Sequence, residues 1–194
     1  MEVSVPFSFL PGESGKWRGG IGDIALGYKR LLFSSLPSGS ILSVQGEAIL
    51  PTGNRDKGFG AGVTILETFA SYGQLLPKKC FLQFQSGIEL PTDTDRANRA
   101  VYWRTVFGKS MNQGKGLGRA WSPMVELLAD REFATGERIN WDFVPQFQVT
   151  LSTRQHIRAN FGVRLPANDF SSRPVQFVFY FLWDWFDGGI RQGW

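Results

Sequence analysis

The chain has 194 residues, enough for one folded domain spanning 1–194, and its 42% hydrophobic and 14% aromatic residues exclude a disordered protein. The net charge is +4, and the basic residues are scattered among acidic ones, so we expect no nucleic-acid partner. The single cysteine, Cys80, excludes an intramolecular disulfide, and no apolar run reaches the roughly 18 residues that a membrane-spanning helix needs.

Leu-Pro pairs recur along the chain, and each closes a run of alternating apolar and polar residues. They are Leu10-Pro11, Leu50-Pro51, Leu90-Pro91 and Leu165-Pro166, at spacings of 40, 40 and 75 residues. Proline cannot donate a backbone hydrogen bond to a neighbouring strand, so it favours strand ends and edges. We therefore expect these four strands to end at one common rim, in units of roughly forty residues that each hold two long strands.

Alternation with a period of two predicts ten strands and indicates no helix in the same windows. The expected strands are 2–10, 20–33, 41–50, 62–75, 81–90, 100–109, 121–133, 140–152, 157–165 and 175–186. Long polar links alternate with shorter ones between these strands, except that 110–120 is long where a short link is expected. This order predicts an all-β fold, an antiparallel up-and-down barrel with the features of a transmembrane β-barrel.

Strand length and polarity indicate that the apolar face points outward into lipid. The strand candidates reach about nine to twelve residues, close to the length that crosses a hydrocarbon core and longer than the average strand of a soluble protein. The opposite face holds bulky polar residues of both charges, which can line a lumen through cross-strand pairing. The expected lumen-lining residues are Asp23, Lys29, Gln45, Glu47, Gln83, Glu89, Arg104, Glu126, Asp130, Asp142, Gln146, Gln148, Arg158 and Arg164.

Two questions stay open at this point. The polar face could instead be a solvated outer surface, since spacing alone does not give the direction of the alternation. Aromatic residues near the strand ends suit the girdles found at membrane interfaces, and they equally suit ordinary apolar packing. These aromatic residues are Tyr72, Phe81, Trp103, Trp121, Trp141, Trp183 and Trp185.

Several short motifs resemble one family of outer-membrane proteins. The segment Gly20-Ile21-Gly22-Asp23, followed by Leu50-Pro51-Thr52-Gly53, resembles the β-barrel family named for the meta-pathway of phenol degradation. The segments 2–7, 145–151 and 183–189 add weaker similarity. The resemblance implies a channel or transporter of the Gram-negative outer membrane, with aromatic or hydrophobic compounds among its candidate solutes and no catalytic residues. It also implies a signal peptide and further N-terminal sequence, so we expect the natural protein to begin upstream of Met1.

The sequence offers little for catalysis or metal binding. His156 is the only histidine, and with Cys80 as the only soft ligand we expect no metal site, no cofactor and no nucleophilic triad. The glycine-rich segments 58–62 and 114–118 lack the strand-turn-helix context of a phosphate-binding loop. Glu47 and Glu89 form a conceivable carboxylate dyad, but charges inside a barrel are more often structural pairs. We therefore expect a protein that is not an enzyme.

The first hypothesis is thus a non-catalytic outer-membrane β-barrel that passes a small solute, with membrane lipid as its surroundings. A plugged barrel that scaffolds a periplasmic or outer-membrane partner is a variant of it. The alternative from another class is a soluble calyx, whose apolar face would point inward around a lipophilic ligand. The calyx predicts that Phe147, Phe161 and Phe177 are shielded from solvent.

Overall fold

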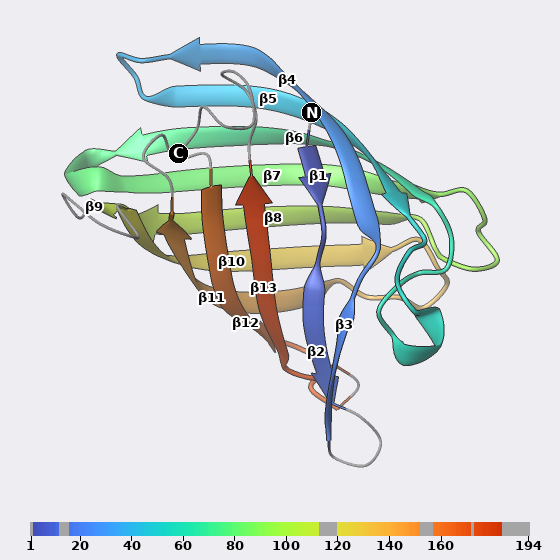
Figure 1. The fold of residues 1–194 in the computed structure, drawn as a ribbon. Helices are drawn as coiled ribbons and strands as arrows, with labels where there is room; N and C mark the ends of the chain where they lie inside the picture. The colour runs from blue at the N-terminus through green and yellow to red at the C-terminus, as the bar shows by residue number, and fades with distance from the viewer. Residues whose placement is uncertain (1, 12–15, 113–119, 152–156, 172, 184–194) are drawn as a thin grey trace.

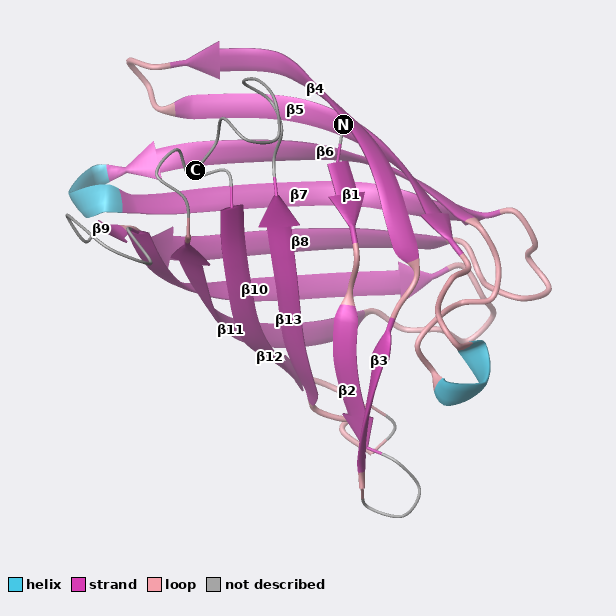
Figure 2. Ribbon diagram, in the orientation of Figure 1, coloured by secondary structure: helices cyan, strands magenta, loops and turns pink. Residues whose placement is uncertain are grey.

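The structure is a computed structural model that describes residues 2–11, 16–112, 120–151, 157–171 and 173–183 (Figure 1). The described residues form one antiparallel sheet, and two short 3-10 helices, η1 (Arg55–Lys57) and η2 (Pro77–Lys79), lie in its connections (Figure 2). The predicted all-β, up-and-down architecture is confirmed. None of the described helices is long and apolar enough to span a membrane.

The observed strands agree closely with the alternation in the sequence. They are β1 (Glu2–Ser4), β2 (Phe7–Pro11), β3 (Trp17–Ile21), β4 (Ile24–Ser35), β5 (Ser40–Leu50), β6 (Ile65–Leu76), β7 (Cys80–Pro91), β8 (Ala100–Lys109), β9 (Met111–Asn112), β10 (Ala120–Glu132), β11 (Asn140–Thr150), β12 (Ile157–Pro166) and β13 (Gln176–Trp183). The predicted strand 100–109 coincides with β8. The irregular link 110–120 starts with β9, which prolongs β8 along β10, and its residues 113–119 lie outside the described residues.

The two N-terminal strands differ from the prediction because each is broken. β1 and β2 are separated at Val5 and Pro6, and β3 and β4 are separated at Gly22 and Asp23. The two breaks lie side by side, since Gly22 N donates to Pro6 O at 2.8 Å. Proline has no amide hydrogen to give to a ladder, which explains why the pairing stops there.

The ladders return to their starting point and close the sheet at its loop-facing end, through a short last ladder. β1 pairs with β4, β2 pairs with β3, and β2 also pairs with β13 through three residue pairs. If β1–β2, β3–β4 and β8–β9 are each counted as one strand, the described strands number ten, as the sequence predicts. In Figure 1, β12, β13, β1 and β2 run down the front of the view and β7, β8 and β10 run across behind them, so that two walls face each other.

The Leu-Pro pairs lie at one rim of this barrel, which we call the loop rim. Leu50 pairs with Ile24, Pro91 with Ile65, and Pro166 with Asp142, each at the end of its ladder. The long links 51–64, 92–99, 133–139 and 167–175 all leave from this end. The short turns 36–39 and 77–79 lie at the opposite end, the turn rim.

Candidate functional site

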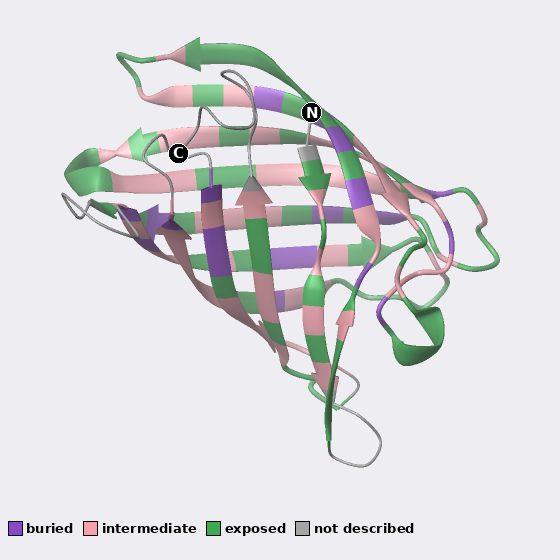
Figure 3. Cartoon of the chain, viewed as in Figure 1, coloured by how far each residue is buried: buried purple, intermediate pink, exposed green. Residues whose placement is uncertain are grey.

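The inner face of the barrel is polar and the outer face is apolar. Asp142 on β11 has no exposed surface and Asn160 on β12 is 2% exposed, and both lie on the face that carries the hydrogen-bonded side chains. Phe161 and Phe177, on the opposite face of β12 and β13, are 52% and 50% exposed. Figure 3 shows this alternation of exposed and less exposed segments along the strands. The arrangement reverses that of a water-soluble protein, in which apolar side chains face inward.

The structure places the predicted lumen-lining residues on the inner face, with one exception. Those on the inner face are Lys29, Gln45, Glu47, Gln83, Glu89, Arg104, Glu126, Asp130, Asp142, Gln146, Gln148, Arg158 and Arg164. Two of them, Lys29 and Gln83, are exposed, whereas Gln45 is buried. The exception is Asp23, because the break between β3 and β4 takes it out of the strand.

Asp23 instead holds the loop 51–64 at the loop rim. Its two carboxylate oxygens accept hydrogen bonds from Gly53 N at 2.8 Å and from Ala61 N at 2.7 Å. Further along the same loop, buried Phe59 packs on Gly20 of β3, where a Cβ atom would lie about 2.5 to 2.7 Å from the phenylalanine ring. Only a glycine leaves room for this ring against the wall. The Gly-Asp element of the sequence is therefore a loop anchor.

We expect Asp23→Ala to release the loop 51–64 from the barrel. The substitution removes two hydrogen bonds to a charged acceptor, each worth about 1.5–3 kcal/mol. Local opening should then make trypsin cleavage at the exposed Arg55 and Lys57 at least about tenfold faster. The control is Asp56→Ala, which removes a carboxylate from the same loop; equal cleavage rates for the two variants would contradict the anchoring role.

Tyr102 is the centre of a polar cluster on the inner face of β6, β7 and β8. Its hydroxyl donates to Glu67 Oε1 and accepts a hydrogen bond from Gln85 Nε2 at 3.0 Å. The guanidinium carbon of Arg104 lies 4.9 Å from the centre of its ring, within the range of a cation–π contact. Across the ladder from Tyr102 is Gly87, where a Cβ atom would approach the ring to 2.8 Å. The absence of a side chain at Gly87 thus leaves room for the Tyr102 ring.

Three carboxylates stand side by side next to this cluster. Glu67 on β6 pairs in register with Glu47 on β5 and with Glu89 on β7. Residues directly opposite in an antiparallel pair have Cβ atoms about 4.5–5.5 Å apart, so this acidic row concentrates negative charge on one part of the inner wall. Glu47 and Glu89 were expected on the inner face, whereas Glu67 was not. Phe69 lies on the same inner face of β6 as Glu67. Because Phe69 is apolar, the alternation in the sequence does not mark this face of β6 as polar.

A second group of inner-face contacts lies on the neighbouring strands. Glu126 on β10 accepts a hydrogen bond from Gln146 Nε2 and lies 4.0 Å from Arg104 Nε, as measured from Glu126 Oε1. On the next strands, Asn160 Nδ2 donates to the Tyr180 hydroxyl at 2.8 Å. These contacts join β8 to β10, β10 to β11, and β12 to β13 on the inner face.

Asp142 binds two arginines near the loop rim. Arg164 Nε donates to Asp142 Oδ2 at 2.6 Å, and Arg173 Nη2 lies 2.6 Å from both carboxylate oxygens. Arg164 also reaches Asp130 on β10, at 3.4 Å. Because Arg173 belongs to the link between β12 and β13, this cluster fastens that link to the wall of the barrel.

The inner-face hydrogen bonds and ion pairs described above run along the wall. Each of these hydrogen bonds and ion pairs joins side chains on neighbouring strands, on strands separated by a single strand, or on the links that leave those strands. Among the described residues there is no group of three or more His, Cys, Asp and Glu side chains that could hold a metal ion. His156 lies outside the described residues. The inner wall can therefore offer carboxylates, guanidinium groups and amides to a solute.

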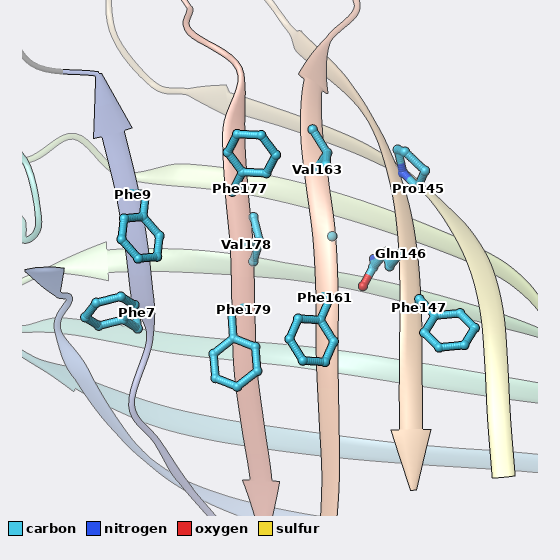
Figure 4. A pocket seen from close by; sticks show the side chains of 11 residues that line it. Phe7, Phe9, Pro145, Gln146, Phe147, Phe161, Val163, Phe177, Val178 and Phe179 are labelled. Carbon is cyan, nitrogen blue, oxygen red and sulfur yellow. The ribbon is translucent and has the colours of Figure 1, made fainter. Parts of the chain in front are cut away.

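The outer wall carries an apolar pocket of about 840 Å³ (Figure 4). Phenylalanines from four neighbouring strands line it: Phe7 and Phe9 of β2, Phe177 and Phe179 of β13, Phe161 of β12, and Phe147 of β11. These strands include the closing ladder between β13 and β2. The closure of the barrel is therefore covered on the outside by aromatic rings.

The aromatic residues expected near the strand ends divide between the two faces. Trp103 and Trp141 point outward near the loop rim, with ring centres 5.2 Å apart, and Trp121 points outward near the turn rim beside Phe147. Tyr72 is also on the outer face. For Phe81 the structure favours ordinary packing over a girdle, because this residue faces inward, where its ring occupies the position that a side chain at Gly108 would fill. Trp185 and the side chain of Trp183 lie outside the described residues.

A comparison with protein-family models gives no match for this chain, and a comparison with curated proteins gives none either.

Proposed function

We propose that the chain is a β-barrel of a Gram-negative outer membrane and that a small solute passes along its polar inner wall without being chemically changed. The inverted polarity of the barrel carries this proposal. An outward apolar band with a polar interior is the arrangement expected of a barrel that is surrounded by lipid. The Gly-Asp and Leu-Pro-Thr-Gly motifs are in keeping with such a family.

Strand length and the outer tryptophans support the membrane location. The long strands β4 to β8 and β10 to β12 have 10 to 13 residues, about what tilted strands need to cross a hydrocarbon core. Trp103 and Trp141 near one rim and Trp121 near the other suit the two interfaces of a bilayer. The aromatic pocket would then lie against acyl chains.

The alternative of a soluble calyx has less support. A calyx needs its apolar face inside, and it predicted that Phe147, Phe161 and Phe177 are shielded from solvent. Phe161 and Phe177 are half exposed on the outer wall instead. An amphipathic wall of this orientation would present a broad apolar surface to water, which soluble monomers rarely do.

Conductance measurements test the proposed passage. The purified chain, inserted into planar lipid bilayers, should give stepwise ion currents, because carboxylates and guanidinium groups lie along the polar inner wall that the solute would follow. Silence at all voltages from a correctly inserted barrel would contradict the channel and favour the plugged barrel. Recovery of a stable monomer in water without detergent would contradict the membrane location itself.

The acidic row predicts a preference for cations. We expect the double variant Glu67→Gln with Glu89→Gln to lower the ratio of cation to anion permeability at least severalfold, because rings and rows of carboxylates select cations in pores. Reversal potentials under a salt gradient measure this ratio. The matched control is Glu137→Gln, which removes a carboxylate from the exposed link 133–139. A permeability ratio unchanged from the parent protein would show that solute does not pass this row.

A further inference from the structure

One segment of the barrel wall has no described strand paired with it on one side. β4 pairs with β5 along Ile24–Ser35, but on its other side it pairs with β1 only at Ala25, Leu26 and Gly27. Beyond Gly27, no described strand pairs with β4 on that side. β13 likewise pairs with β2 only at residues 177–179, so its last four residues have β12 alone as a described partner. Among the described strands, the barrel is thus closed at the loop rim, and toward the turn rim no strand pairs with the free side of β4 beyond Gly27 or with that of β13 beyond Phe179.

Burial along β4 agrees with an uncovered edge. Residues 28–34 are all exposed, on both faces of the strand, which occurs along no other long described strand. Leu31, Leu32 and Phe33 are each 52–54% exposed in direct succession. Exposed apolar residues on an unpaired edge favour the addition of another strand. Figure 1 shows β4 running on past the end of β1.

We propose that this edge of β4 is a docking site for one extended polypeptide strand, which adds to the barrel in line with β1. The register of β1 sets the direction and the facing of that strand. Glu2, Val3 and Ser4 pair with Gly27, Leu26 and Ala25, so the added strand runs antiparallel to β4 and covers Tyr28 to Ser35 with about eight residues. Backbone pairing of this kind gives affinity, and the side chains at alternate positions give specificity.

The side chains of the edge specify the chemistry of the added strand. Lys29 faces inward and forms no salt bridge with any described residue, so the position opposite it suits an acidic side chain. Tyr28 and Phe33 face outward, so the neighbouring positions of the added strand suit apolar side chains. The occupant is therefore an extended segment of alternating polarity, apolar toward the exterior and polar or acidic toward the lumen.

The energetic reason for a docked strand rests on the proposed membrane location. Within a hydrocarbon layer, unpaired backbone amide and carbonyl groups each cost several kcal/mol, and natural barrels therefore leave no open edge. An unpaired stretch of β4 in lipid would be costly to maintain. The opposing expectation is a free edge, since Lys29, Arg30 and the bulge between Leu31 and Phe33 are features that also keep edges unpaired.

A peptide-binding experiment in detergent micelles tests the docking site. The probe is a dye-labelled ten-residue peptide that alternates valine with threonine and carries glutamate at the position opposite Lys29. Its control has the same sequence with N-methyl groups on the amides that face β4, which removes the backbone donors and leaves the side chains in place. We expect saturable binding of the first peptide, measured by fluorescence anisotropy, and at least tenfold weaker binding of the second.

A charge exchange tests the register. Lys29→Glu should weaken binding of the glutamate peptide and strengthen binding of the same peptide with lysine at that position, each severalfold. Far-UV circular dichroism verifies that the variant keeps its β-structure, and the N-methylated control is decisive without any variant. No binding, or equal binding of the methylated peptide, overturns the proposal. Micelle binding does not depend on conductance, so failure here is distinct from failure of the channel.

Discussion

Asp142→Ala is expected to destabilise the barrel by about 3–5 kcal/mol. The carboxylate has no exposed surface, and its two arginine partners, Arg164 and Arg173, have side chains that are 32% and 19% exposed. Removing one member of a buried ion pair leaves the other charges desolvated without compensation, which is far more costly than losing an exposed pair. Urea unfolding in detergent, followed by tryptophan fluorescence, measures the change in the free energy of unfolding.

The matched control for this substitution is Asp93→Ala. Asp93 pairs with Arg96 at 3.2 Å, but both side chains are about half exposed, so the loss should be at most about 1 kcal/mol. The double variant Asp142→Ala with Arg173→Ala should recover part of the stability, because it removes one of the stranded charges. If Asp142→Ala stays within about 1 kcal/mol of the parent protein, Asp142 does not hold the link to the wall.

Phe161→Arg is expected to destabilise the protein in lipid vesicles by about 2–4 kcal/mol, beyond the effect of losing an aromatic ring. Phe161 lies in the middle of β12 on the outer wall, and an arginine near the midplane of a bilayer costs about this much on the lipid face of a barrel. Denaturant unfolding from vesicles measures the cost. Phe161→Leu gives the contribution of the ring alone.

The inner-face control for this substitution is Val178→Arg. Val178 pairs with Gly162 next to Phe161 but faces the lumen, so an arginine there can stay hydrated and should change the stability by about 1 kcal/mol or less. The contrast between the two arginines tests which face meets the lipid. Equal costs at the two positions would contradict a lipid-facing outer wall.

The sequence predicted the strands well because alternation is a local property. β8 coincides with its predicted range, and most other long strands agree with theirs to within about two residues at ends that the structure describes. Alternation also predicted which residues of β11 and β12 face inward, because polar and apolar residues alternate along these strands almost without exception. These features depend only on the pleat of each strand, which repeats every two residues.

The sequence-based predictions failed where contacts between residues far apart in the chain determine the position or role of a side chain. Asp23 was expected in a strand wall, but its position depends on a loop some thirty to forty residues away. Glu67 was missed because its importance comes from the register of three strands, and the inward Phe69 beside it disguises the alternation. Phe81 was one candidate for an outer aromatic girdle, but it faces inward, where its ring fills the space beside Gly108. No pattern within a single strand contains this information.

The way the circuit closes has a consequence for the order of folding. When β1–β2, β3–β4 and β8–β9 are each counted as one strand, every described ladder except one joins strands that follow one another along the chain. The wall can therefore grow hairpin by hairpin from local contacts with little loss of chain entropy. The exception joins Phe7, Ser8 and Phe9 to Phe179, Val178 and Phe177, across almost the whole length of the chain. This pairing cannot form until β13 exists. The N-terminal segment can pair early with β3 and β4, but its pairing with β13 must wait for the last strand, so closure is the final pairing step.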